Sequence, residues 1–203
     1  MAIIFKNDVP YGGTVDDPYI RYNTITGKVQ IKDAEGVWHN LMDGGLLRKY
    51  ILQDGIVNTE LVGTISNTGW YAASATYPIR ATQPVFSMTG FTITGAGGSA
   101  INNIAVGGTE KAVDLTDINK VCVTIKASSN GGALNICKGN KWVKFDNTYR
   151  PTDAVLVAIN EFDANTADKV IELNVSQLTG LHYLAVTTNK MVGTVEVGDW
   201  WME

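Results

Sequence analysis

The stretch VIELNVSQLTGLHYLAVTTN, residues 170–189, decides the fold class of this chain. Ile171, Leu173 and Val175 occupy alternate positions with polar residues between them, which is the two-residue period of a strand with one buried face. Turn-forming residues follow, and another apolar run begins a few residues later. The stretch therefore predicts two successive strands joined by a short turn.

The same pattern continues towards both ends of the chain. Apolar residues alternate at Val121, Val123 and Ile125, and residues 155–159 are apolar on both faces, as in a central strand. Shorter strand-like runs occur near residues 85–94, 134–145 and 192–197. Strands separated by about ten residues and by Gly or Asn turns are typical of a sandwich or barrel. We predict an all-β chain in which residues 56–203 form a jelly-roll-like β-sandwich.

The N-terminal part reads as a separate β-module. YIRYNTITGKVQIKDAEGVWHNL, residues 19–41, alternates apolar and polar residues, with Thr26-Gly27 and Glu35-Gly36 as turns. This pattern predicts a three-stranded meander within residues 1–42. So short a module buries little apolar surface, so we expect it to pack against another protein or against its own copies.

Residues 43–55, DGGLLRKYILQDG, carry the clearest helical pattern and predict a short helical connector. The apolar positions recur at i, i+1, i+4 and i+5; they are Leu46, Leu47, Tyr50 and Ile51. Two interpretations remain open, a connector docked on the sandwich or a short helix at an oligomer axis. In the second case these four residues form the oligomer interface.

Composition and charge limit the classes of partner. Of the 203 residues, 45% are hydrophobic and 18% charged, which indicates a folded protein. The net charge is −4 and no run of Lys or Arg follows a phosphate backbone, so nucleic acid is not an expected partner. No run approaches the ~20 apolar residues of a membrane helix, and none at the N-terminus is long enough for a signal peptide. We expect synthesis in a reducing cytoplasm and no membrane insertion.

The sequence offers little for catalysis. It contains two histidines and no G-x-S-x-G, Cys-x-x-Cys or His-x-x-x-His motif, so we expect no enzyme, no metal site and no cofactor. Acidic residues in the segments 113–117 and 160–168 could pair across a glycosidic bond, or hold a calcium ion in the second segment. The favoured interpretation is that these Asp and Asn side chains form turns.

Two cysteines, Cys122 and Cys137, flank the turn-like segment 128–132. If this segment closes a hairpin, the two residues fall near opposite positions on adjacent strands. A cross-strand disulfide is then possible, but two buried, unreactive thiols are the favoured state.

Aromatic residues beside turns are the most suggestive feature for binding. Exposed aromatic rings stack on the apolar faces of sugars, while neighbouring polar side chains bind the hydroxyl groups. The candidate glycan contacts are Trp70, Tyr71, Trp142 and Tyr149, with Asn140 and Arg150 as polar partners. The alternative for each ring is packing in the core or in an interface.

Several segments resemble known families. RYNTITGKVQIKDAEGVWHNL, residues 21–41, resembles a meander near the ends of tailed-bacteriophage fibre proteins, and MAIIFKNDVPYGG, residues 1–13, resembles the start of phage virion proteins. Residues 170–189 are similar to the last strands of jelly-roll carbohydrate-binding modules, and GTVEVGDWWME, residues 193–203, to their closing strand.

The resemblance implies a virion structural protein, a short head or tail fibre with a receptor-binding role. It also implies a homotrimer whose N-terminal module attaches to capsid, tail or baseplate proteins and whose sandwich contacts a host glycan. The alternatives are a free bacterial carbohydrate-binding module and a glycan-cleaving enzyme.

Overall fold

The computed structural model describes residues 20–23, 28–32, 38–40, 48–72, 77–143 and 155–203. The chain forms two compact units, residues 1–48 together with Glu203, and residues 49–202. In the first unit, strands β1 (Ile20–Asn23), β2 (Lys28–Lys32) and β3 (Trp38–Asn40) pair antiparallel in that order. The predicted N-terminal meander is confirmed.

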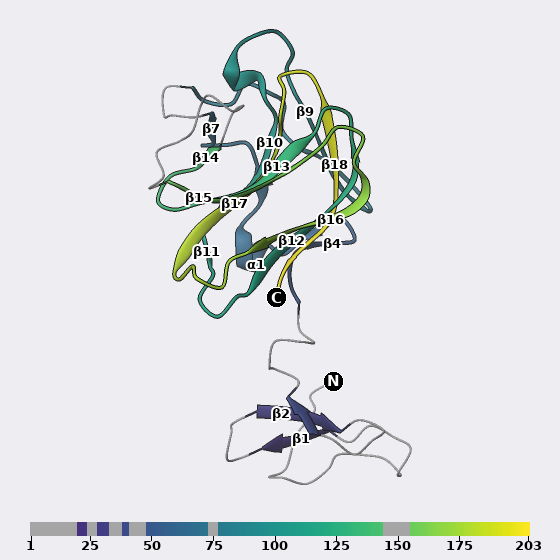
Figure 1. The fold of residues 1–203 in the computed structure, drawn as a ribbon, viewed down its shortest axis with the longest axis vertical. Coiled ribbons are helices and arrows are strands. Elements are labelled where there is room, and N and C mark those ends of the chain that lie inside the picture. The colour runs from purple at the N-terminus through teal and green to yellow at the C-terminus, as the bar shows by residue number, and fades with distance from the viewer. Residues whose placement is uncertain (1–19, 24–27, 33–37, 41–47, 73–76, 144–154) are drawn as a thin grey trace. The chain divides into compact units, whose positions relative to one another are not determined.

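The second unit is a sandwich of two antiparallel sheets (Figure 1). Sheet I contains, in order, β15 (Leu156–Phe162), β13 (Gly132–Cys137), β17 (Leu181–Thr188), β10 (Val106–Thr109) and β6 (Ile65–Ser66), and β11 (Val113–Asp114) also pairs with β17. Sheet II contains, in order, β16 (Ala167–Asn174), β12 (Lys120–Ser128) and β18 (Thr194–Met202). On the side away from β12, β18 pairs with two hairpins. One is β4 (Lys49–Gln53) with β5 (Ile56–Val57), and the other is β9 (Gly90–Thr94) with β8 (Val85–Ser87).

Three short elements complete the described part of the sandwich. Strands β7 (Tyr71–Ala72) and β14 (Trp142–Val143) form a separate parallel pair. The only helices among the described residues are α1 (Thr59–Val62) and the 3-10 turn η1 (Ile101–Asn103). The chain is therefore all-β with barely any helix, as predicted.

The long strands follow a jelly-roll-like order. Sheet II runs β9-β18-β12-β16 and sheet I runs β10-β17-β13-β15. Each of these strands is followed by a strand of the opposite sheet, except that β13 and β15 share sheet I. This crossing pattern is that of a double-sheet jelly roll with two Greek keys.

The core between the sheets is built from the alternating residues of the sequence pattern. In β16, Ile171 and Leu173 are buried while Glu172 between them is exposed. From sheet I, Leu134 and Leu184 are fully buried in the same cluster. Each buried side chain of this size contributes roughly 1.5–3 kcal/mol to the free energy of unfolding, and sheet pairing satisfies the backbone polar groups.

The predicted helical connector is wrong over the residues that the structure describes. Lys49–Gln53 is strand β4, which pairs with β18 in the register Tyr50–Trp201 and Leu52–Trp200. The adjacent residues Ile51 and Leu52 of this strand are both fully buried, so β4 lacks the simple alternation that identifies a strand in the sequence. The expected domain boundary at residue 56 falls between β4 and β5, which pair with each other. The rest of the connector, including Leu46 and Leu47, lies outside the described residues.

The segment 128–132 does not close a hairpin. Strand β12 pairs with β16 and β18 in sheet II, whereas β13 pairs with β15 and β17 in sheet I. Cys122 and Cys137 consequently lie in different sheets, and both are buried thiols outside any disulfide. The expectation of buried thiols is confirmed, and the cross-strand disulfide is ruled out by this topology.

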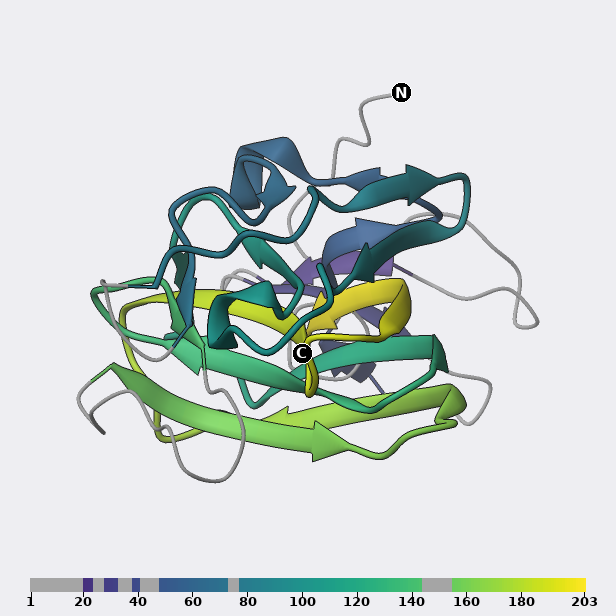
Figure 2. The same cartoon turned by 90° about the horizontal axis from the view of Figure 1, so that it is seen from above.

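The run at residues 155–159 belongs to an edge strand, not to a central one. Among the described strands, β15 pairs only with β13, and its other edge faces β16 of sheet II (Figure 2). The side-chain amide of Asn160 donates a hydrogen bond to the backbone carbonyl of Glu172 across this edge, at 2.7 Å. The run is apolar on both faces because Val157 packs against the inner core and Leu156 against a second apolar cluster on the outer face of sheet I.

Candidate ligand-binding site

The outer face of sheet I carries a second apolar cluster, here called the outer cluster. Its buried members are Trp70, Ala72, Ile104, Val106, Cys137, Val143, Val155 and Ala185. Strand alternation explains the split between the clusters, because Ile136 and Leu184 face the inner core while their neighbours Cys137 and Ala185 face outward. The cover comes from chain segments far away in the sequence, including the β7–β14 pair (Figure 1).

Trp70 is the central residue of the outer cluster and is only 1% exposed. Its ring lies against Gly108 of β10, where an added Cβ would overlap it, and it meets Tyr183 edge to face at 6.3 Å between ring centroids. The prediction that Trp70 stacks on a ligand is therefore wrong. The glycine leaves a flat gap in the sheet that a large ring fills, so Trp70 serves packing instead.

Tyr71 and Trp142, two of the candidate contacts, lie in adjacent strands. They occupy paired positions of the parallel strands β7 and β14, and both side chains are half-buried. The backbone N–H of Tyr71 donates to the carbonyl of Lys141 at 2.9 Å. Paired positions on adjacent strands lie on the same face, so the two side chains are neighbours.

Strand β14 pairs with β7 and not with the preceding strand β13. After β13, the N–H of Lys138 donates to the carbonyl of Val155 at 2.7 Å, and Gly139 adopts φ +82°. A left-handed backbone of this kind suits glycine and turns the chain sharply. Strand β14 consequently leaves β13 and pairs with β7.

Lys141 adds a positive charge to this aromatic group. Its Nζ lies 5.2 Å from the centroid of the Tyr183 ring, within the range of a cation–π interaction. Partial burial lowers the pKa of the Lys141 ammonium, and the carboxylate of Glu110 opposes this shift. Asn140, immediately before Lys141, is exposed.

We call the group Tyr71, Trp142, Tyr183, Lys141 and Asn140 the aromatic site. The other two candidate contacts, Tyr149 and Arg150, lie outside the described residues. The sequence reasoning missed Lys141 although it stands between two chosen residues. It also missed Tyr183, because only the sheet topology brings β17 beside the β13–β14 loop.

The acidic segments form turns where the structure describes them. The carboxylate of Asp114 accepts hydrogen bonds from the N–H and the hydroxyl of Thr116, at 2.9 and 2.7 Å, and these bonds lower its pKa. The carbonyl of Asp163 accepts from the hydroxyl of Thr166 at 2.8 Å. The side chain of Asp114 forms a turn as predicted, whereas Asp163 contributes only its backbone carbonyl.

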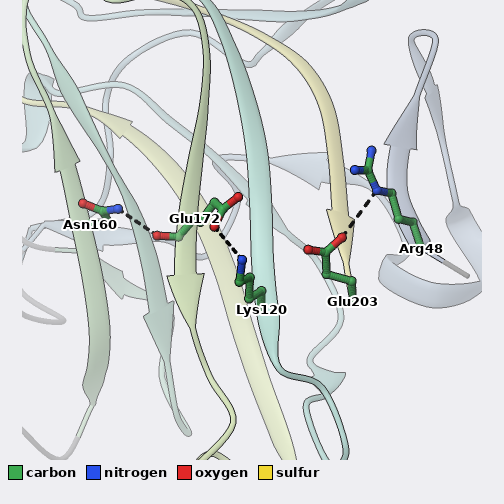
Figure 3. A network of polar contacts seen from close by, with 5 residues as sticks. All are labelled: Arg48, Lys120, Asn160, Glu172 and Glu203. Atoms are coloured by element: carbon green, nitrogen blue, oxygen red, sulfur yellow. Dashed lines mark hydrogen bonds and ion pairs between the residues drawn. The ribbon is translucent and has the colours of Figure 1, made fainter. Parts of the chain in front are cut away.

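The exposed charges of sheet II form surface ion pairs. Lys120 Nζ lies 2.8 Å from Glu172 Oε2, with both side chains more than two-fifths exposed (Figure 3). A second pair, Arg48 and Glu203 of the N-terminal unit, has 3.4 Å between Nε and Oε2 (Figure 3). Exposed pairs of this kind contribute roughly 0–1 kcal/mol to stability.

No family model, curated protein or solved structure matched this chain. In the part of the chain that the structure describes, no three or more His, Cys, Asp or Glu side chains gather closely enough to hold a metal ion. Among the same residues, no helix has the length and apolar character needed to cross a membrane.

Proposed function

We propose that this protein is a non-catalytic attachment protein of a bacteriophage virion, a short head or tail fibre whose sandwich binds a host-surface glycan. The observation that carries the proposal is the in-register pair Tyr71 and Trp142, with the amide of Asn140 beside it. Half-exposed rings with neighbouring hydrogen-bonding groups are the usual means of holding a sugar.

The backbone under the site supports this use because it is fixed on both sides. The carbonyl of Trp70 accepts from Ile79 at 3.1 Å, and the N–H of Ala72 donates to the carbonyl of Tyr77 at 2.9 Å. On the other side, β7 pairs with β14. Since Trp70 is also buried directly before Tyr71, little conformational entropy is lost when a ligand binds.

The N-terminal unit is the proposed attachment module. Its meander, β1 to β3, is the segment that resembles phage fibre proteins. We expect residues 1–42 to bind a capsid, tail or baseplate protein, so the protein would act on the virion. Residues 49–202 form a separate compact unit, which suits one module for attachment and another for binding.

A homo-oligomer, a trimer by resemblance, would raise avidity by about 10² to 10⁴ without new contacts to the ligand. The interface first predicted needs correction, because Ile51 is fully buried in the sandwich core and Tyr50 packs 6.3 Å from Trp201. Ile51 cannot meet a second chain while the sandwich is folded, and Leu46 and Leu47 lie outside the described residues.

An alternative contact between copies is the edge patch of sheet II. Its exposed apolar residues are Ile56, Val85, Phe86 and Met88. The β4–β5 and β8–β9 turns touch, since an added Cβ at Gly55 would overlap the backbone of Ser87. Among the described strands β8 pairs only with β9, and no charged or histidine residue occurs between Arg80 and Glu110. Two negatively charged chains can meet here without placing like charges together.

The oligomer proposal is tested with Met88→Glu, at a position 90% exposed. A buried carboxylate at the contact should convert the oligomer to a 21.9 kDa monomer in light scattering. The matched control is Val192→Glu, at a residue 57% exposed in another loop, which should leave the mass unchanged. A monomeric wild-type protein at micromolar concentration would contradict the proposal.

The binding proposal is tested on glycan arrays and host cells with the purified full chain. Trp142→Ala should weaken binding about 5- to 150-fold, the equivalent of a stacking ring worth 1–3 kcal/mol, while the melting curve stays cooperative. The control Tyr50→Ala removes a half-buried ring from sheet II and should leave glycan affinity unchanged. The proposal fails if the wild type binds no glycan and virions lacking the protein adsorb normally.

A further inference from the structure

We propose that the aromatic site selects acidic glycans, with the ammonium of Lys141 pairing with a carboxylate on the sugar that stacks beside it. This inference rests on the proposed glycan-binding function and specifies the chemical class of the ligand. It starts from the surroundings of Lys141.

The Lys141 side chain is held against the protein. Its Nζ lies over the Tyr183 ring at 5.2 Å, and its stem passes Gly69, where an added Cβ would lie 3.8 Å from Cδ. Tyr183 in turn meets the buried Trp70 ring. The positive charge is therefore attached to the rigid part of the site, so that a ligand anion finds it already oriented.

Within the described ranges, the Lys141 ammonium forms no ion pair with a carboxylate. Among the described residues, Lys141 Nζ makes no hydrogen bond and has no carboxylate within 4.0 Å. Glu110 influences its pKa, but the Glu110 carboxylate accepts the backbone N–H of Thr64 at 3.2 Å and packs against Gly63. An ammonium has three N–H donors, and partial burial without an acceptor is unfavourable. An anionic ligand would supply the acceptor in a charge-assisted hydrogen bond.

The local charge also favours an anion. The loop KGNKW, residues 138–142, carries Lys138 and Lys141 and no acidic residue, in a chain of net charge −4. Lys138 is exposed, and Glu110, already bonded to Thr64, is the acidic group that acts on Lys141. The loop consequently presents more positive than negative charge next to the stacking rings.

The position of the Lys141 ammonium relative to the aromatic rings fits a sugar acid. Its Nζ lies 5.2 Å from the centroid of the half-buried Tyr183 ring, one of the three rings of the aromatic site. When a pyranose ring stacks face-on against an aromatic ring, its carboxylate projects from the sugar's edge, where a neighbouring side chain can reach it. A neutral sugar would satisfy the aromatic rings but leave the ammonium without its acceptor.

The test is an array of glycans containing glucuronic, galacturonic or sialic acid, each beside its carboxyl-reduced counterpart. Wild-type protein should bind at least one acidic form about 10- to 100-fold more tightly than its reduced form, the range expected for one charge-assisted hydrogen bond. Lys141→Gln should bind both forms equally, at the affinity of the wild type for the reduced form. Lys141→Arg should keep the preference, and Lys190→Gln, at an exposed lysine elsewhere, should behave as the wild type.

A second readout is the pH dependence of the same binding. Because partial burial lowers the pKa of Lys141 below its usual 10.5, the acidic preference should decline at a lower pH than for an ordinary lysine. The affinity for the reduced glycan should not change over that range.

Three results would overturn the inference. Equal wild-type binding of acidic and reduced forms would overturn it while leaving glycan binding intact. An acidic preference that survives in Lys141→Gln would show that another group recognises the carboxylate. Binding of neither form by the wild type would overturn both this inference and the proposed function.

Discussion

The outer face of sheet I lies under a second apolar cluster, whereas the outer face of sheet II carries mainly polar and charged side chains. All six residues of β13 in sheet I are buried. In β16 of sheet II, buried residues alternate with exposed ones such as Glu172, which pairs with Lys120 (Figure 3). The proposed binding site lies on the covered sheet.

The apolar cover on sheet I also positions residues of the proposed binding site. Strand β10 contains Gly107 and Gly108, and an added Cβ would overlap Phe91 of the inner core at the first and Trp70 of the outer cluster at the second. The strand therefore lies between two aromatic rings. The outer ring supports Tyr183 and, through it, Lys141. The described part of sheet II carries no second apolar cluster of this kind, although Cys122 and Trp201 are buried there.

Removing the Trp70 ring from the outer cluster should cause the largest loss of stability. Trp70→Ala deletes the fully buried ring of the outer cluster and should lower the free energy of unfolding by about 3–5 kcal/mol, measured by urea denaturation. Trp142→Ala, at a half-buried ring of the same site, should cost clearly less. A loss below about 1 kcal/mol for Trp70→Ala would mean that the outer cluster is not a second core.

Adding a methyl group at Gly108, beneath the Trp70 ring, should lower the stability by an intermediate amount. Gly108→Ala should cost about 1–3 kcal/mol, because the new methyl group overlaps Trp70. In a Trp70→Ala background the same substitution should cost less, since the clash is gone. Additive effects in this double-mutant cycle would contradict the contact. Gly139→Ala is the control for backbone strain, because Gly139 has φ +82° but no atom within 4 Å of an added Cβ.

Removing an exposed side chain from the outer face of sheet II should change the stability only slightly. Lys120→Ala removes an exposed ion pair with Glu172 and should alter the free energy of unfolding by less than about 1 kcal/mol. A larger loss would show that the outer face of sheet II is as important for stability as that of sheet I. Urea denaturation under the conditions used for Trp70→Ala makes the two values comparable.

Adding a reductant should leave the melting temperature unchanged, because the two thiols lie in different sheets and form no disulfide. Burial raises the pKa of the Cys137 thiol to about 12, so almost no thiolate is present at pH 8. Neither Cys122 nor Cys137 should react with Ellman's reagent before unfolding, and both should react in denaturant. A melting temperature that falls on addition of reductant would indicate a disulfide and contradict the placement of the thiols in separate sheets.

Local patterns were sufficient for the parts of the fold that depend on local geometry. The alternation at Ile171, Leu173 and Val175 predicted a half-buried strand, and the N-terminal turns predicted a meander. The predictions that failed concerned pairing. Strands that follow each other were expected to form hairpins, which is the commonest arrangement, but in this topology most of them cross to the opposite sheet.

The candidate site likewise contains residues that the sequence identified and residues that only the tertiary structure brought to it. Sequence reasoning selected Trp70 and Trp142 on equal terms, because both stand beside turns. The structure separates them, since the Trp70 ring is fully buried against Gly108 of β10, whereas Trp142 pairs with β7 and stays half-buried against the outer cluster. Tyr183 joined the site only because β17 is the neighbour of β13.

The sequence by itself determined that the chain is all-β, that it has an N-terminal meander and a larger sandwich, and which strands have one polar face. These properties follow from side-chain period and turn chemistry, which act over a few residues. The tertiary structure alone decided which face is covered twice, which aromatic rings stay accessible and where Lys141 lies. Such outcomes depend on contacts between segments far apart in the chain, and no local pattern encodes the partner of a given strand.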